Sequence, residues 1–219
     1  MRLQESLQAL PCAFCEAGGM RFAPTSFRPV FGRVISVAMA VIAVLGLAGF
    51  IVAGDLLGLL RMTPLLALLT ALAFVLFWFP RVDVAEHEVT VVNVFQTVHV
   101  PWPSIENVDT RFALTLATPE GKVTAWASPA PNRYAAFGAA RGDARLAADA
   151  AGAHPRPGDL PSTESGSVAF VIRRHWQDLN EQGLLSAGPE PGAVRRTTHV
   201  TTIVVLAVLA VATAAGLLL

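Results

Sequence analysis

The residues that could carry chemistry in this chain are few and stand far apart. Cys12 and Cys15 form a CxxC pair near the N-terminus, a spacing typical of thiol redox motifs and of half a zinc site. No second CxxC and no pair of histidines supplies the other zinc ligands, and no strand-helix-strand pattern surrounds the pair. A redox or metal-responsive role for Cys12 and Cys15 therefore stays an alternative hypothesis, and we expect no cofactor.

The sequence also contains none of the common catalytic motifs that we sought, namely GxSxG, HExxH and GxxxxGK[ST]. Glu86-His87-Glu88 places a histidine between carboxylates, but adjacent strand residues point to opposite faces, so we expect a solvated turn there. Trp102, between two prolines, is the residue that we single out. It is either a core anchor where strands bend, which we prefer, or an aromatic anchor for a partner. We expect a protein that is not an enzyme.

The amino-acid composition indicates whether the protein is soluble or embedded in a membrane. Of 219 residues, 53% are hydrophobic and only 15% are charged, whereas soluble proteins have about 25% charged residues. The 16 Lys and Arg balance the 16 Asp and Glu, so there is no basic field that would attract nucleic acid. A mean hydropathy of +0.54 indicates that lipid is part of the solvent. The composition excludes disordered and nucleic-acid-binding proteins and predicts a membrane protein.

Three uncharged runs predict transmembrane helices, because about 20 apolar residues cross the hydrocarbon core. They are residues 34–54, 62–80 and 200–219. Thr63 is expected to cap the second helix, with Pro64 at its first position, so that residues 55–61 form a short connection between the first two spans.

Arginines flanking these runs predict the orientation, because cytoplasmic flanks retain positive charge. Only Arg61 lies in the connection between the first two spans. Six arginines flank the other side, at positions 21, 28, 33, 81, 195 and 196, of which Arg33, Arg81, Arg195 and Arg196 are expected at the anionic membrane surface. Residues 1–33 have no cleavable signal peptide pattern. We expect a plasma membrane protein with a cytoplasmic N-terminal tail (1–33), a cytoplasmic central domain and an external C-terminus.

Between the second and third spans, the sequence predicts a small β domain that ends in a helix. Residues 81–85, 88–95 and 97–100 alternate apolar and polar side chains as strands do, and Pro119 and Gly121 form the turn of a later hairpin. Capping residues at 162–165 begin an amphipathic helix that ends near Gly183. We expect a domain over residues 81–183, with a flexible insert at 128–161, and then a linker over 184–199.

Three motifs of this domain resemble the bacterial PH-domain proteins of actinobacteria, of the low molecular weight protein antigen 6 type. They are Val-Pro-Trp-x-x-Ile at 100–105, Pro-Glu-Gly at 119–121 and Lys-Val-Thr-Ala-Trp-Ala at 122–127. The resemblance implies a PH-like, partly open antiparallel β-barrel with a C-terminal amphipathic helix. The fold class is then an α+β membrane protein with three transmembrane helices.

PH-like proteins that bind phosphoinositides use clustered Lys and Arg in a hairpin loop. The corresponding turn here, residues 93–97, contains none, so we do not expect specific phosphoinositide binding. We expect a non-enzymatic interaction or scaffold module at the cytoplasmic face, whose partners are the bilayer and a membrane-associated protein. The alternatives are an accessory subunit of a membrane complex and the sensor that would use Cys12 and Cys15.

Overall fold

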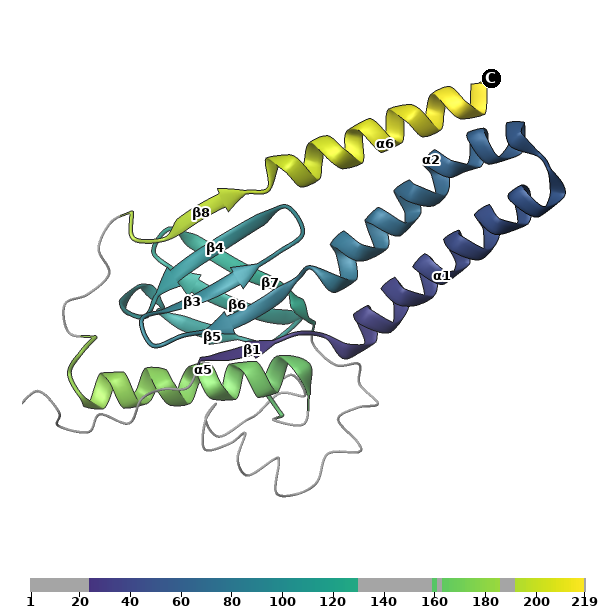
Figure 1. Ribbon diagram of the computed structural model, residues 1–219. Coiled ribbons are helices and arrows are strands. Elements are labelled where there is room, and N and C mark those ends of the chain that lie inside the picture. Colours follow the sequence, from purple (N-terminus) through teal and green to yellow (C-terminus); the bar gives the residue numbers. More distant parts are fainter. Residues whose placement is uncertain (1–23, 130–158, 161–162, 186–191, 219) are drawn as a thin grey trace, which may run out of the picture.

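The computed structural model describes residues 24–129, 159–160, 163–185 and 192–218. Three long helices stand side by side, and a β domain lies at one end of them (Figure 1). The C-terminus lies at the opposite end, and so does the connection between the first two helices. Cys12 and Cys15 fall outside the described residues.

Each of the three long helices is long and apolar enough to cross a membrane. They are α1 (Val30–Ala53), α2 (Leu56–Ala73) and α6 (Val200–Leu218), and α2 continues into a π-helix, η1 (Phe74–Trp78). Helix α2 packs against both α1 and α6. Many apolar side chains on these helices are exposed, as expected when the surrounding solvent is lipid. The expectation of three such helices is confirmed.

The second helix begins earlier than the sequence predicts. Gly54, at φ +70°, ends α1 in the left-handed conformation, and the Asp55 side chain caps α2 by accepting a hydrogen bond from Gly58 N at 2.8 Å. The predicted cap at Thr63 is wrong, because its hydroxyl donates to Leu59 O within the helix, and Pro64 lies in the helix interior. Residues 56–61 are therefore helical, not a connection.

A close crossing joins the start of α1 to the end of α2. Ser36 is buried, and its hydroxyl donates to Ala73 O at 3.1 Å and to Gly32 O at 3.0 Å. A Cβ atom at Gly32 would lie 2.5 Å from Phe77 O, which is closer than real contacts allow. Glycine at position 32 therefore lets the two helices meet.

We expect Gly32→Leu to push α1 away from η1 and to lower the stability of the helix pair by about 1–3 kcal/mol, as overpacking does. The midpoint of thermal unfolding in detergent measures this loss. Gly49→Leu is the matched control, because Gly49 lies on the same helix with no neighbour within 4 Å. Equal midpoints for the two variants would contradict the crossing.

The β domain consists of two antiparallel sheets, and the described strands form an open arrangement, not a closed barrel, in agreement with the expected partly open antiparallel β structure. Sheet A is ordered β1 (Thr25–Phe27), β2 (Arg81–Val84), β3 (Glu88–Val92), β4 (Gln96–Pro101) and β8 (Arg195–Thr198). Sheet B is ordered β5 (Asn107–Asp109), β6 (Ala113–Thr118) and β7 (Gly121–Pro129). A short 3-10 helix, η2 (Trp102–Ser104), connects β4 to β5.

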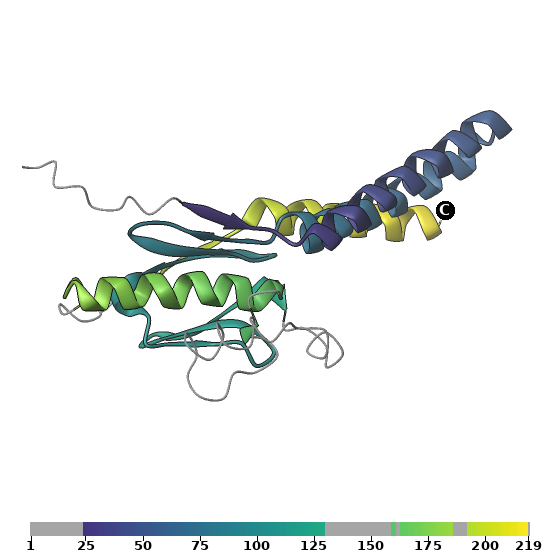
Figure 2. The ribbon, with the colours of Figure 1, turned by 90° about the horizontal axis from the view of Figure 1, so that it is seen from below.

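The core lies between the two sheets and under the amphipathic helix α5 (Glu164–Glu181). Alternate valines of β2, β3 and β4 point inward and meet Leu114 and Leu116 of sheet B. Helix α5 lies along the open side between the sheets (Figure 2) and contributes Val168 and Ile172 to this core. Thr163 caps it by accepting from Gly166 N at 3.0 Å.

Strands β1 and β8 were not predicted. The first lies in the expected N-terminal tail, and the second lies in the expected linker. Strand β1 pairs with β2, and β8 pairs with β4, so each is extended because a neighbouring edge supplies its hydrogen bonds. The expected N-terminal tail therefore contains a strand at residues 25–27, and the linker predicted over 184–199 is wrong at residues 195–198, which form a strand.

The predicted flexible insert at 128–161 is fixed at both ends. Ser128 is buried at the end of β7, and Asp159 and Leu160 are buried beside α5. The Asp159 carboxylate accepts from Arg173 of α5 at 2.7 Å and from Thr110 at 2.6 Å. The rest of the insert, residues 130–158, lies outside the described residues.

Candidate functional site

Sheet A is joined directly to all three long helices. Two residues separate β1 from α1, two separate η1 from β2, and one separates β8 from α6. A flexible tether needs a run of unpaired residues, and none of these three connections provides one. The β domain is therefore attached to the helices by short connections and not by flexible linkers (Figure 1).

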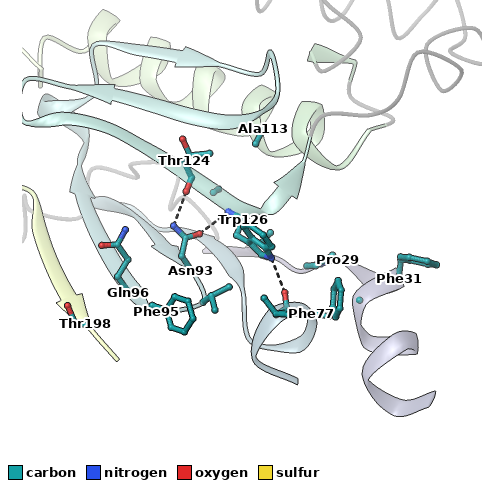
Figure 3. A pocket seen from close by; sticks show the side chains of 15 residues that line it. Pro29, Phe31, Phe77, Asn93, Phe95, Gln96, Ala113, Thr124, Trp126 and Thr198 are labelled. Carbon is teal, nitrogen blue, oxygen red and sulfur yellow. Dashed lines mark hydrogen bonds between the residues drawn. The ribbon is translucent and has the colours of Figure 1, made fainter. Parts of the chain in front are cut away.

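A hydrogen bond from the domain reaches η1, the π-helical end of the second span. In an α-helix the Leu76 carbonyl would accept from the N–H of residue 80, but Pro80 has none. Trp126 of β7 supplies the missing donor, and its indole Nε1 donates to Leu76 O at 3.0 Å (Figure 3). Pro80 thus ends the helix and also leaves a carbonyl to which the domain binds.

We expect Trp126→Phe to weaken the attachment of the domain by about 1 kcal/mol, because the ring is kept but one hydrogen bond is lost. Urea titration of the full-length protein in detergent measures the loss. Trp78→Phe is the control, since Trp78 lies at the same helix end and stacks on Phe74 at 5.9 Å through its ring alone. A larger loss for Trp78→Phe than for Trp126→Phe would contradict this role of the indole.

The Asn93 side chain connects the two sheets at the same corner. Its Nδ2 donates to Thr124 O at 2.8 Å, and its Oδ1 accepts from Trp126 N at 2.8 Å (Figure 3). Both backbone groups lie on the edge of β7 that faces away from β6. One carboxamide therefore takes the place of a neighbouring strand, and that part of the β7 edge is not open to an added strand.

A cavity of about 840 Å³ lies where β7, the turn between β3 and β4, and the ends of α1 and α2 meet (Figure 3). Its lining is mainly apolar, and no charged side chain is among it. The aromatic members are Phe31, Phe77, Phe95 and Trp126, and the polar members are Asn93, Gln96, Thr124 and Thr198. An apolar cavity with a few neutral polar groups is typical of a small-molecule or lipid site.

A comparison with protein families identifies the β domain. Residues 79–157, about a third of the chain, match the family model described as the bacterial PH domain. The chain contains a bacterial PH domain. The matched residues include β2 to β7, and with them both bonds of Asn93 and the part of the cavity lining that β7 and the turn between β3 and β4 supply. No curated protein and no solved structure matches the chain significantly.

PH domains mediate interactions with proteins or lipids and are generally not catalytic. The PH domain of this chain therefore indicates an interaction module. The closer resemblance to the antigen 6 type stays a prediction.

The outer face of the PH domain's sheet A carries a row of polar side chains. Paired residues follow one another across all five strands, in the order Ser26, Asp83, Thr90, His99 and Arg195. His99 Nδ1 lies 2.7 Å from Glu88 Oε1, and Arg81 Nε donates to Asp83 Oδ2 at 2.8 Å. Donors and acceptors at fixed spacing on a sheet are suited to a polar partner surface.

Trp102 belongs to the core of the PH domain. It is 2% exposed, its Nε1 donates to Ala85 O at 3.1 Å, and its ring meets the ring of His175 edge to face at 4.8 Å. A partner protein does not reach a side chain with so little exposed surface. The prediction of a partner anchor at Trp102 is corrected, and the alternative of a core anchor fits the contacts.

The four arginines predicted at the membrane surface all lie near ends of the long helices. Arg33 is in the first turns of α1, with its guanidinium 5.9 Å from the Trp78 ring centre, and Arg81 begins β2, separated from the end of η1 by two residues. Arg195 and Arg196 are exposed on β8, just before α6. Contact with lipid headgroups stays a prediction for these residues.

Within residues 24–129, 159–160, 163–185 and 192–218, no group of three or more His, Cys, Asp or Glu side chains is placed to hold a metal ion. The redox or metal role of Cys12 and Cys15 stays a prediction, because both lie outside those ranges. Trp126 and Asn93 were not among the site residues predicted from the sequence. An available signal was that Trp126 stands out of phase with the buried Val123, Ala125 and Ala127, so that the largest side chain of this strand does not enter the core.

Proposed function

We propose that this protein is a non-enzymatic, membrane-anchored PH-domain module that recruits or scaffolds a protein partner at the cytoplasmic face of the plasma membrane. The supporting observation is the direct connection of sheet A to three helices, each long and apolar enough to cross a membrane. A domain fixed at the bilayer meets membrane-associated partners at a raised effective concentration, so weak contacts suffice.

The proposed sidedness follows from the arginines. All connections between helices and domain are at one end, and Arg28, Arg33, Arg81, Arg195 and Arg196 all lie near that end. The opposite end has Arg61 in the second turn of α2. Because cytoplasmic flanks retain positive charge, the PH domain faces the cytoplasm, and the C-terminus of α6 lies outside.

The proposed partner surface is the outer face of sheet A. Its polar row is exposed or half-buried, and no other described element covers it (Figure 2). The edge strand β8 is short and begins with two arginines, which opposes pairing with a further strand. A partner therefore docks on the face, through polar side chains, and not on this edge.

A photoreactive amino acid at Thr90, in the middle of the row, tests this proposal in native membranes. We expect it to cross-link reproducibly to one protein, because Thr90 lies where the partner docks. The control is the same substitution at Thr115, an outward residue of sheet B. No adduct from Thr90, or the same adducts from both positions, would count against the proposed surface.

The two alternatives have separate tests. An accessory subunit of a membrane complex would migrate on a native gel far above the monomer mass in every condition. A sensor that uses Cys12 and Cys15 would lose metal content or its response when both are replaced by serine, and an unchanged double variant would exclude it.

A further inference from the structure

We propose that the cavity between the PH domain and the helix ends binds one phospholipid of the surrounding bilayer. The proposal rests on the membrane insertion proposed above and adds a ligand site to it. In this site the part of an acyl chain next to the ester group lies against the aromatic lining residues, which we call the aromatic floor. The ester carbonyls face the neutral polar side chains of the lining.

The position of the cavity selects a lipid as its occupant. Phe31 and Gly32 belong to the start of α1, and Leu76 and Phe77 belong to η1, which ends the second span, so one side of the cavity is made of the two spans themselves. Ends of membrane-spanning helices lie at the boundary between hydrocarbon and headgroups, where aromatic side chains are enriched. A cavity at this depth is adjacent to acyl chains and ester groups.

The chemistry of the lining agrees with this choice. Gln96 and Thr198 pair across β4 and β8, and both line the cavity (Figure 3). Neither side chain has a hydrogen bond to another residue that the structure describes, so a carboxamide N–H and a hydroxyl are available as donors. Ester carbonyls are acceptors, and an acyl chain fits the aromatic floor. The uncharged lining disfavours a charged peptide, whose buried charge would have no partner.

The size and exposure of the site are also suitable. Small-molecule sites usually enclose about 300–1,000 Å³, and the cavity, at about 840 Å³, lies within this range. Phe31, Phe95 and Trp126 are 73%, 49% and 55% exposed. Aromatic surface of this extent is costly in water but is covered when lipid fills the cavity.

Native mass spectrometry of the full-length protein tests the proposal. The protein is reconstituted in vesicles of phosphatidylethanolamine and phosphatidylglycerol and then extracted into mild detergent. We expect the wild type to retain one phospholipid. Thr198→Phe fills the cavity and should lower the retained fraction about tenfold. Thr197→Phe is the matched control, because Thr197 is the neighbouring exposed residue of β8 and does not line the cavity, and its retention should equal that of the wild type.

Gln96→Leu is a second variant, which keeps the volume but removes the donor, and it should also lower retention. The melting temperature of each variant shows whether it is folded. Equal retention by Thr198→Phe and Thr197→Phe, or a wild type that retains no phospholipid, would overturn the site. So would cross-linking of a photoreactive group at Phe95 to residues 1–23 or 130–158 of the same chain.

If alkali extracts the protein from membranes, the proposed function itself fails, whereas an integral protein without a bound lipid refutes only the site.

Discussion

We expect Trp102→Ala to lower the free energy of unfolding of the PH domain by about 3–5 kcal/mol, as large-to-small changes at buried aromatic positions do. Trp102 is 2% exposed, it packs against His175, and its indole satisfies the carbonyl of Ala85. The alanine variant leaves a cavity and also an unpaired carbonyl. Urea titration of the full-length protein in detergent, followed by the fluorescence of the remaining tryptophans, measures the loss.

Trp102→Phe is the companion variant. It keeps most of the buried ring and loses the hydrogen bond, so its cost should be about 1–3 kcal/mol. A Trp102→Ala protein that unfolds at the wild-type urea concentration but no longer binds its partner would restore the role of a partner anchor and contradict the assignment to the core.

We expect Asp159→Ala to cost a similar amount, about 3–5 kcal/mol, because it leaves a largely buried guanidinium without its carboxylate. The side chains of Arg173 and Asp159 are 15% and 6% exposed and meet at 2.7 Å. Arg173 also donates to Val108 O at 2.7 Å, so this one pair holds α5 and the end of the insert against β5. The same urea titration applies, and hydrogen exchange of α5 should increase.

The double variant Asp159→Leu with Arg173→Met distinguishes two contributions to the lost free energy of unfolding. One is the burial of an unpaired Arg173 charge, and the other is the loss of the ion pair itself. Replacing a buried ion pair by apolar side chains of similar volume is often neutral, so the double variant should recover most of the stability. Asp159→Ala with wild-type stability, or a double variant less stable than the single one, would contradict the role given to this pair.

Strands and helices with a strong local pattern could be predicted from the sequence. The alternation of valines in β2, β3 and β4 identifies the core face of sheet A, and every inward valine of these strands is buried. The turn before β7 was predicted from Pro119 and Gly121, and Gly121 indeed adopts φ +120°. Thr163 was among the capping residues expected at the start of α5.

Elements that depend on distant partners could not be predicted in this way. Strand β8 reads Arg-Arg-Thr-Thr, has no apolar alternation and is extended only because β4 offers an edge. The start of α2 was misplaced at Pro64 because proline is common in the first turn of helices. A membrane helix also tolerates proline in its interior, and Pro64 lies there. Gly54 followed by Asp55 was the local signal for the true boundary.

The candidate site was missed for the same reason. Its cavity combines β7, the turn at Asn93, β8 and the ends of the first two long helices, and its lining runs from Pro29 to Thr198 in the chain. Local patterns identify which side chains are out of phase with the core, as for Trp126, but not which carbonyl such a side chain meets. The bond between Trp126 and Leu76 depends on the proline that ends α2 and on the register of β7.

Labelling of single cysteines with a membrane-impermeant maleimide tests most directly whether the protein holds its PH domain at the cytoplasmic face. Cys12 and Cys15 are first replaced by serine, and a cysteine is placed either at Leu56, at the exposed end of the helix pair, or at Thr90, on sheet A. We predict that Leu56→Cys is labelled in intact cells and that Thr90→Cys is labelled only after the membrane is permeabilised. Labelling of Thr90→Cys in intact cells would contradict the proposed orientation, and with it the cytoplasmic scaffold.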